Sequence, residues 1–243
     1  MEATRVTPLR VFPTPESLGS QLAVELLDRI RRGRKPFLLG CPTGRTPRPI
    51  YDALADADLS DVIFVMMDEY LVPGTAGLSW ASEGEPWSCH SFVERNFRFQ
   101  RRDVWFPDPA DPAAYDRKIA DAGGIDLFLL ASGASDGHVA FNSTGSPRES
   151  RTRVVPLSDA TRRDNLQTFP SFGALESVPR HGVTVGIDTI AQARESIMVV
   201  WGASKRLTLQ RMLAADRYDP GWPATVIHEC AVRAIVTDAA AAE

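Results

Sequence analysis

Apolar side chains recur with a helical period near the start of the 243-residue chain. The predicted stripe consists of Leu18, Leu22, Leu26 and Ile30. Residues four positions apart lie on one face of a helix, so this pattern predicts an amphipathic helix with that face buried. Thr14 followed by Pro15 is a typical helix start, and Gly33 is a typical helix end.

Later apolar runs are continuous, which is typical of strands buried on both faces. The predicted strands are residues 36–41, 62–70, 125–132, 183–187, 196–202 and 232–238. The predicted helices lie within residues 43–55, 88–97, 111–123, 188–194 and 204–215, and residues 238–243 are predicted to be a frayed end. Because strands alternate with helices, we predict an α/β fold with a mostly parallel, Rossmann-like central sheet and helices on both faces. No repeat or linker divides the chain, so residues 1–243 are expected to form a single domain.

One long stretch interrupts this alternation. Residues 71–87 are rich in Gly, Pro, Ser and Trp, which predicts a long surface loop. Long loops in compact domains often serve as lids or binding loops. The helix predicted at 88–97 follows directly and carries His90 at its start.

Composition and charge narrow the class of protein. The hydrophobic fraction of 44% and the charged fraction of 24% are ordinary for a globular protein. The N-terminus has no signal-peptide core and no apolar run is long enough to span a bilayer, so we expect a cytoplasmic protein without a membrane partner. The net charge of −4 gives no electrostatic reason to expect nucleic acid as a partner. The cysteines Cys41, Cys89 and Cys230 show neither zinc-ligand nor redox spacing, so no metal site is expected.

Candidate anion-binding residues follow two of the predicted strands. In open α/β sheets, ligands bind at the carboxyl ends of the strands. The segment "GCPTGRTP" (40–47) joins a strand to a helix, where backbone amides favour a phosphate or carboxylate. Its candidate residues are Thr43, Gly44, Arg45 and Thr46. Lys205 follows the strand at 196–202 and can reach a bound phosphate as a point charge. An ordinary capped turn and a solvated lysine are the structural alternatives.

Two acidic segments at strand ends are candidates for proton transfer. Asp68 and Glu69 end the strand at 62–70, and we expect one to face the cleft while the scaffold holds the other. A carboxyl group beside apolar residues has a raised pKa, which suits a general base. Asp136 precedes His138 by two residues and can orient its imidazole, which moves protons readily near neutral pH. A helix cap, an ion pair and a polar turn remain as structural alternatives.

Five segments, taken together and in this order, resemble the glucosamine-6-phosphate deaminase/isomerase family, which shares its fold with 6-phosphogluconolactonases. They are "PTGRTP" (42–47), "MDEY" (67–70), "DGHVAFN" (136–142), "SRTRVV" (150–155) and "VPRHGVTVGIDTI" (178–190). The resemblance extends from about residue 10 to residue 238. It implies conversion of glucosamine 6-phosphate to fructose 6-phosphate and ammonia, without a cofactor and with a small sugar phosphate as the binding partner.

The resemblance also implies roles for individual residues. Asp68 moves the proton between C1 and C2, and His138, oriented by Asp136, acts in opening the sugar ring. The residues implied to bind the substrate and its phosphate are Thr43, Gly44, Arg45, Thr46, Ser132, Ser143 and Lys205.

Three positions depart from the family pattern. The glutamate that usually follows "DGHVAFN" is replaced by Ser143, and a serine is no acid–base group near neutral pH. The second phosphate-binding arginine aligns with Gln167, and Arg45 is a plausible replacement for it. Ser132 stands where a glycine is expected. These departures identify a divergent member whose natural substrate can differ from glucosamine 6-phosphate.

Three functions therefore stay open. The preferred one is an amino-sugar-phosphate isomerase/deaminase, because Asp68 is intact. The second is a lactonase of the 6-phosphogluconolactonase type, in which His138 activates water and Ser143 is no handicap. The third is a non-catalytic sugar-phosphate sensor, in which the missing glutamate reflects lost chemistry. The oligomeric state is also open, with a homo-oligomer among the possibilities.

Overall fold

The computed structural model describes residues 7–75 and 77–243. Its centre is a seven-stranded sheet in the order β1-β11-β10-β7-β2-β3-β6, in which every neighbouring pair is parallel. Its strands are β1 (Leu9–Phe12), β2 (Phe37–Cys41), β3 (Asp58–Met66), β6 (Gln100–Trp105), β7 (Leu127–Ala131), β10 (Glu195–Val200) and β11 (Val232–Asp238). The predicted α/β fold with a mostly parallel central sheet is confirmed.

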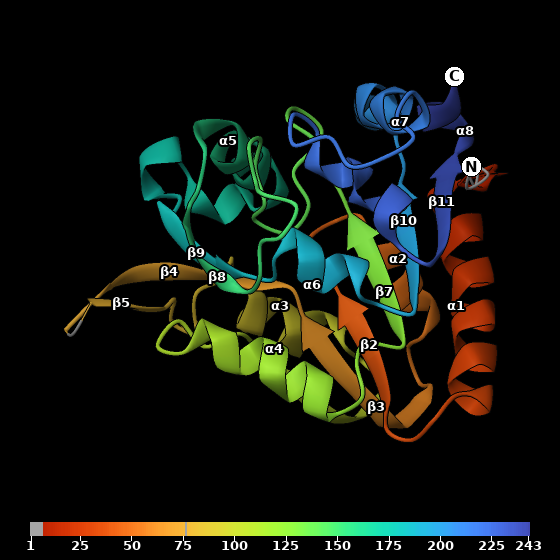
Figure 1. Cartoon of the computed structure of the whole chain (residues 1–243), viewed down its shortest axis with the longest axis horizontal. Helices are drawn as coiled ribbons and strands as arrows, with labels where there is room; N and C mark the ends of the chain where they lie inside the picture. Colours follow the sequence, from red (N-terminus) through yellow and green to blue (C-terminus); the bar gives the residue numbers. More distant parts are fainter. Residues whose placement is uncertain (1–6, 76) are drawn as a thin grey trace.

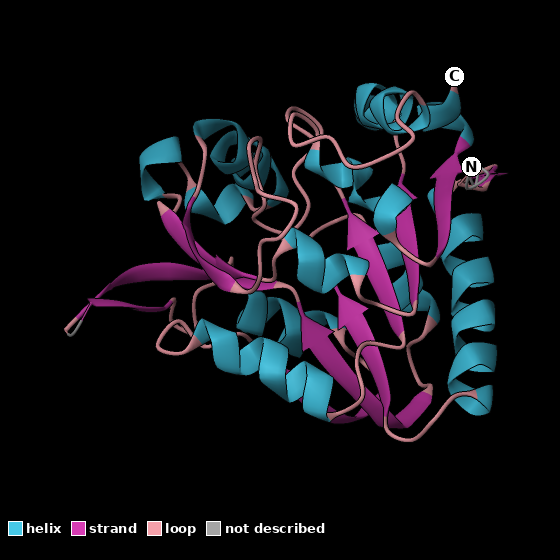
Figure 2. Cartoon of the chain, viewed as in Figure 1, coloured by secondary structure: helices cyan, strands magenta, loops and turns pink. Residues whose placement is uncertain are grey.

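Helices cover both faces of this sheet (Figures 1 and 2). They are α1 (Pro15–Arg32), α2 (Arg48–Ala53), α3 (Cys89–Asn96), α4 (Pro112–Asp121), α5 (Asp159–Thr168), α6 (Ile187–Ala191), α7 (Arg206–Leu213) and α8 (Ala239–Ala242). Neighbouring residues of β2 point to opposite faces of the sheet. Leu39 packs on one face in a core with α1, α2 and α3. Leu38 packs in a second core with α4, α6 and α7. The continuous apolar strands are thus explained by burial on both sides.

The first helix forms as its sequence predicts. The Thr14 hydroxyl accepts a hydrogen bond from the Ser17 amide at 3.2 Å, and Gly33 closes the helix by donating to the Arg29 carbonyl at 2.8 Å. The predicted stripe faces the sheet, and its Leu18 side chain is 0% exposed. The cap and the stripe together fix α1 against the central sheet.

A second, smaller sheet corrects the prediction of one strand at residues 62–70. The chain leaves the central sheet after Met66, and Asp68 begins β4 (Asp68–Gly74) of a four-stranded antiparallel sheet. The other strands are β5 (Gly77–Trp80), β8 (Arg153–Pro156) and β9 (His181–Thr184). Met67, Tyr70 and Leu71 beyond the break are apolar and buried like Val65 and Met66 before it, so the apolar pattern alone does not reveal the break.

The predicted surface loop at 71–87 is also corrected. Its first part completes β4, and the chain then returns as β5, with Leu71 opposite Trp80 in the antiparallel register. This hairpin extends away from the central sheet (Figure 1). Its strand β5 is exposed along its whole length, so the segment has no apolar pattern that would predict a strand.

Two further predictions change. The strand predicted at 183–187 is β9, which ends at Thr184 and pairs with β4 and β8 instead of the central sheet. The tail predicted to fray contains α8, because the Asp238 carboxylate accepts hydrogen bonds from the amides of Ala241 (3.0 Å) and Gly202 (2.9 Å). Among the helices of the described ranges, none has the length and apolarity needed to cross a bilayer.

Replacing Leu18 by alanine tests the packing of α1. The side chain is fully buried, so Leu18→Ala should lower the free energy of unfolding by about 3 kcal/mol. On the same helix, Val24 is 63% exposed, and Val24→Ala should change it by less than about 0.5 kcal/mol. Urea denaturation of both variants measures the difference, and equal losses would contradict the assigned orientation of α1.

Candidate active site

One cavity lies at the carboxyl ends of the central strands, where the predicted site segments meet. Its lining contains Thr43, Gly44, Arg45, Thr46, Asp68, Ser132, His138 and Lys205. These residues come from segments that follow four different strands, β2, β3, β7 and β10. The topology therefore brings together side chains that are up to 162 positions apart, between Thr43 and Lys205.

The turn after β2 is shaped to approach a ligand with its backbone. Gly44 has a φ of +89°, a conformation that L-residues with a side chain rarely adopt. A Cβ atom there would lie 3.2 Å from the Thr168 side chain. Trp201 fixes the end of the turn by donating to the Thr46 carbonyl at 2.8 Å. Arg45 is exposed and lines the cavity, so its charge is available to an anion.

Lys205 brings a partly buried cation to the cavity. It ends a short 3-10 helix (Ala203–Lys205) after β10, and its ammonium donates to the Ser132 carbonyl. Burial lowers the pKa of Lys205 to about 8, and the positive charge of Arg45 adds to this, while the carboxylates of Asp164 and Asp136 oppose it. The lysine is therefore still largely protonated at neutral pH.

The two acids of "MDEY" face opposite ways, as the sequence predicts. Glu69 is 0% exposed, and its carboxylate accepts hydrogen bonds from the amides of Tyr70 (2.7 Å), Cys89 (3.0 Å) and His90 (2.9 Å). The last two amides belong to the first turn of α3, where a helix favours negative charge. The Nδ1 atom of His90 lies 2.6 Å from the same carboxylate. Glu69 is thus the acid that the scaffold holds.

Asp68 is the acid that faces the cavity. It is 6% exposed, and the Cys89 thiol lies 3.6 Å from its carboxylate as the hydrogen-bond donor. Burial and, to a smaller extent, the neighbouring charge of Glu69 raise the pKa of Asp68 to about 7, against the opposing effect of the Cys89 hydrogen bond. A carboxyl group with this pKa can accept and return a proton near neutral pH.

His138 lines the same cavity and is held by Asp136. Its Nδ1 atom lies 2.6 Å from the Asp136 carboxylate, which also accepts from the Thr161 hydroxyl at 3.0 Å. Burial by itself would raise the pKa of Asp136, but the hydrogen bond and charge of His138, aided by Thr161, lower it to about 2. The ionised carboxylate fixes the imidazole through Nδ1, which leaves Nε2 for proton transfer.

The structure adds cavity residues that the sequence did not reveal and leaves two expected ones outside. Helix α5 contributes Asp164, Asn165 and Thr168, but its Gln167 is exposed and is not part of the lining. Helix α5 is polar, with no apolar stripe that would have predicted it. Ser143 also lies outside the lining, in a turn where its carbonyl accepts from the Ser146 amide at 3.1 Å.

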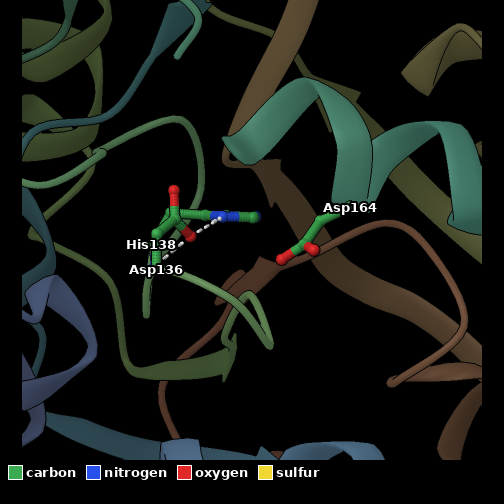
Figure 3. A group of neighbouring side chains, drawn as sticks. All are labelled: Asp136, His138 and Asp164. Atoms are coloured by element: carbon green, nitrogen blue, oxygen red, sulfur yellow. Dashed lines mark hydrogen bonds and ion pairs between the residues drawn. The ribbon is translucent and has the colours of Figure 1, made fainter. Parts of the chain in front are cut away.

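Three of these side chains have the spacing of metal ligands. Asp136, His138 and Asp164 each offer one ligand atom, and these atoms lie within 4.8 Å of one another (Figure 3). The imidazole is already bonded to Asp136, and the ammonium of Lys205 is close enough to both carboxylates for them to affect its pKa. This combination of acids, imidazole and ammonium favours proton transfer and anion binding over cation binding.

Comparisons with protein families and curated sequences agree with one another. A family model described as glucosamine-6-phosphate isomerases/6-phosphogluconolactonase matches residues 13–236. The glucosamine-6-phosphate deaminase of Arthrobacter sp. (strain FB24) is 36% identical over 211 residues, which cover 80% of this chain and 76% of the relative. That of Mycolicibacterium smegmatis is 33% identical over 244 residues, which cover 96% of this chain and 90% of the relative.

Solved structures share the fold over almost the whole chain. A monomeric glucosamine-6-phosphate deaminase matches with a TM-score of 0.84 and 26% identity, covering 97% of this chain and 98% of the other. The 6-phosphogluconolactonase from Trypanosoma brucei matches with a TM-score of 0.71 and 21% identity, covering 97% of both chains. The latter similarity concerns the fold alone.

The raised pKa of Asp68 predicts a pH-dependent effect of Asp68→Asn on stability. A carboxyl group whose pKa is about 7 when folded and about 4 when unfolded binds its proton more tightly in the folded state. The wild type therefore loses stability as the pH rises through this window, and the uncharged asparagine does not. Relative to wild type, Asp68→Asn should gain on the order of 4 kcal/mol in unfolding free energy between pH 4 and pH 8.

Urea denaturation of wild type and Asp68→Asn between pH 4 and pH 8 measures the gap between their free energies of unfolding. Asp136→Asn is the control, because the pKa of Asp136 is lowered to about 2 and its carboxylate is ionised in both the folded and the unfolded state above about pH 5, so the gap between Asp136→Asn and wild type should stay nearly constant there. A gap between Asp68→Asn and wild type that stays constant with pH would contradict the buried, proton-binding state of Asp68.

Proposed function

The chain belongs to the glucosamine-6-phosphate isomerase/6-phosphogluconolactonase family, and on that premise we propose that it converts glucosamine 6-phosphate and water to fructose 6-phosphate and ammonia. The observation that carries the proposal is the position of Asp68. A buried carboxyl group with a pKa of about 7 shares one cavity with a histidine–carboxylate pair and two cations. The isomerisation of an amino sugar needs these groups together.

The cations and the turn after β2 anchor the substrate. The phosphate accepts hydrogen bonds from the backbone and hydroxyls of residues 43–46 and pairs with Arg45 and Lys205. Fixing the phosphate holds the sugar at a set distance from the proton-transfer groups. Such positioning lowers the barrier by avoiding the loss of translational and rotational freedom during the reaction.

The proton transfers then follow from His138 and Asp68, which line the same cavity. His138, oriented by Asp136, transfers the proton that opens the ring, which exposes the C1 aldehyde. Asp68 takes the proton from C2 while His138 gives a proton to the C1 oxygen, which forms an enol-amine, and Asp68 then returns its proton to C1. The resulting C2 imine adds water, and ammonia leaves as the C2 carbonyl of the ketose forms. No step requires a carboxylate at Ser143, although its absence there is expected to slow ring opening.

Lactone hydrolysis is the second candidate, and the position of Ser143 favours it. Ser143 lies outside the cavity lining and supplies no acid–base partner to His138. The imidazole is then available to activate a water molecule. This reaction needs His138 and the anion-binding residues but not Asp68. Activity toward 6-phosphogluconolactone that survives Asp68→Asn would identify it. A sugar-phosphate sensor would bind such ligands without turning any over.

Asp68→Asn tests the deaminase directly. Loss of the proton-transfer group should lower kcat for the release of fructose 6-phosphate and ammonia by about a thousandfold. The control is Asp58→Asn, which removes an exposed acid at the opposite end of β3 and should leave kcat unchanged. A coupled assay for both products measures the rates, and a variant Asp68→Asn with wild-type kcat would rule out the assignment.

Lys205→Ala tests the phosphate site. Removing a charge-assisted hydrogen bond costs about 1.5–3 kcal/mol, which raises KM for a sugar phosphate by about ten- to a hundredfold. In the wild type, KM should rise as the pH passes through about 8, where Lys205 loses its proton. Steady-state kinetics at pH 7 and pH 9 check both effects. The exposed Lys35→Ala is the matched control, and an equal KM for Lys35→Ala and Lys205→Ala would disprove the assignment.

A further inference from the structure

Asp164 is a charged cavity residue that the proposed reaction leaves without a role. It lies on α5 and lines the cavity together with Lys205 and His138. One oxygen of its carboxylate, Oδ2, accepts hydrogen bonds from the amides of Ala134 (2.9 Å) and Ser135 (3.2 Å). Figure 3 shows the Asp164 carboxylate pointing toward His138. A carboxylate at the anion-binding end of a cavity repels an anion, so its presence there needs a physical reason.

The same short turn also binds Lys205. The turn at residues 132–135 receives the Asp164 carboxylate on its amides and the Lys205 ammonium on the Ser132 carbonyl. Thr208 adds a hydrogen bond to the Gly133 carbonyl at 2.8 Å. The opposite charges of Asp164 and Lys205 are thus attached to one rigid turn, which fixes them relative to each other.

Some of the charges around Lys205 favour its protonated form, and others oppose it. Its burial and the guanidinium of Arg45 lower its pKa, and the carboxylates of Asp164 and then Asp136 raise it. Asp68 and His138 line the same cavity as further titratable groups. Because Asp164 is the largest of the charge effects, the ammonium would lose its proton at a lower pH without it.

We propose that Asp164 is a positioning residue for the anion-binding end of the cavity: held on the same turn as Lys205, its carboxylate stabilises the ammonium that binds the anion and so sets the highest pH at which an anion binds. This inference rests on the proposed function, since it takes the Lys205 end of the cavity as the phosphate end. This role also explains why a carboxylate is tolerated at the anion-binding end of the cavity. The carboxylate repels the anion at low pH, but at higher pH it preserves the cation that binds the anion.

Calorimetric titration with sulfate from pH 6 to pH 9 tests this inference without any turnover. Sulfate keeps the same charge over this range, so the pH dependence comes from the protein. Asp164→Asn keeps a carbonyl oxygen for the two amides of the turn but removes the charge. Its sulfate affinity should fall at a pH about one unit lower than that of wild type. At pH 6, where Lys205 is charged in both proteins, Asp164→Asn should bind sulfate at least as tightly.

Two further variants separate charge from structure. Asp164→Glu retains the charge and should lose affinity at the wild-type pH. Glu176→Gln removes one exposed carboxylate outside the cavity and should also follow wild type. If Asp164→Asn and wild type lose sulfate affinity at the same pH, the inference is overturned and Asp164 only holds the turn. If wild type turns over glucosamine 6-phosphate in that case, the proposed function stands without it. If wild type neither binds sulfate nor turns over the sugar, both fail.

Discussion

The buried carboxylate of Glu69 at the N-terminus of α3 is the interaction on which the site depends. It fixes the point where the chain leaves the central sheet after β3 and enters the small antiparallel sheet. With Glu69 turned into the scaffold, alternation along the strand directs Asp68 into the cavity. The same charge that anchors the backbone also raises the pKa of Asp68. One interaction therefore sets both the position and the proton affinity of the candidate base.

Much of the fold is predictable because burial leaves a strong pattern in the sequence. Helix α1 has a complete apolar stripe, and β2 and β7 are continuous apolar runs, so each stands out. Elements that are held by pairing with neighbours do not show such patterns. Half of the residues of strand β6 are charged and the strand is partly exposed, and β5 is exposed throughout, so only the strands beside them define their conformation.

The candidate site likewise contains residues that the sequence predicts and residues that it does not. Asp68, His138 and the turn after β2 are predictable because they directly follow apolar strands, whose ends must meet at one edge of a parallel sheet. Asp164 was not predictable, because it comes from a polar helix far along the chain and is bonded to the turn that follows β7. Ser143 was expected at the substrate but belongs to a turn outside the lining. A position aligned in sequence therefore need not reach the cavity, and an acid can reach it from another element.

Exchange of the C2 proton of glucosamine 6-phosphate in deuterated water, followed by NMR, tests the role of Asp68 most directly. The wild type should incorporate deuterium and form fructose 6-phosphate, and Asp68→Asn should do neither while staying folded. Exchange that persists in Asp68→Asn would contradict the role of Asp68. The absence of exchange in the wild type would contradict the isomerase itself and direct attention to lactones.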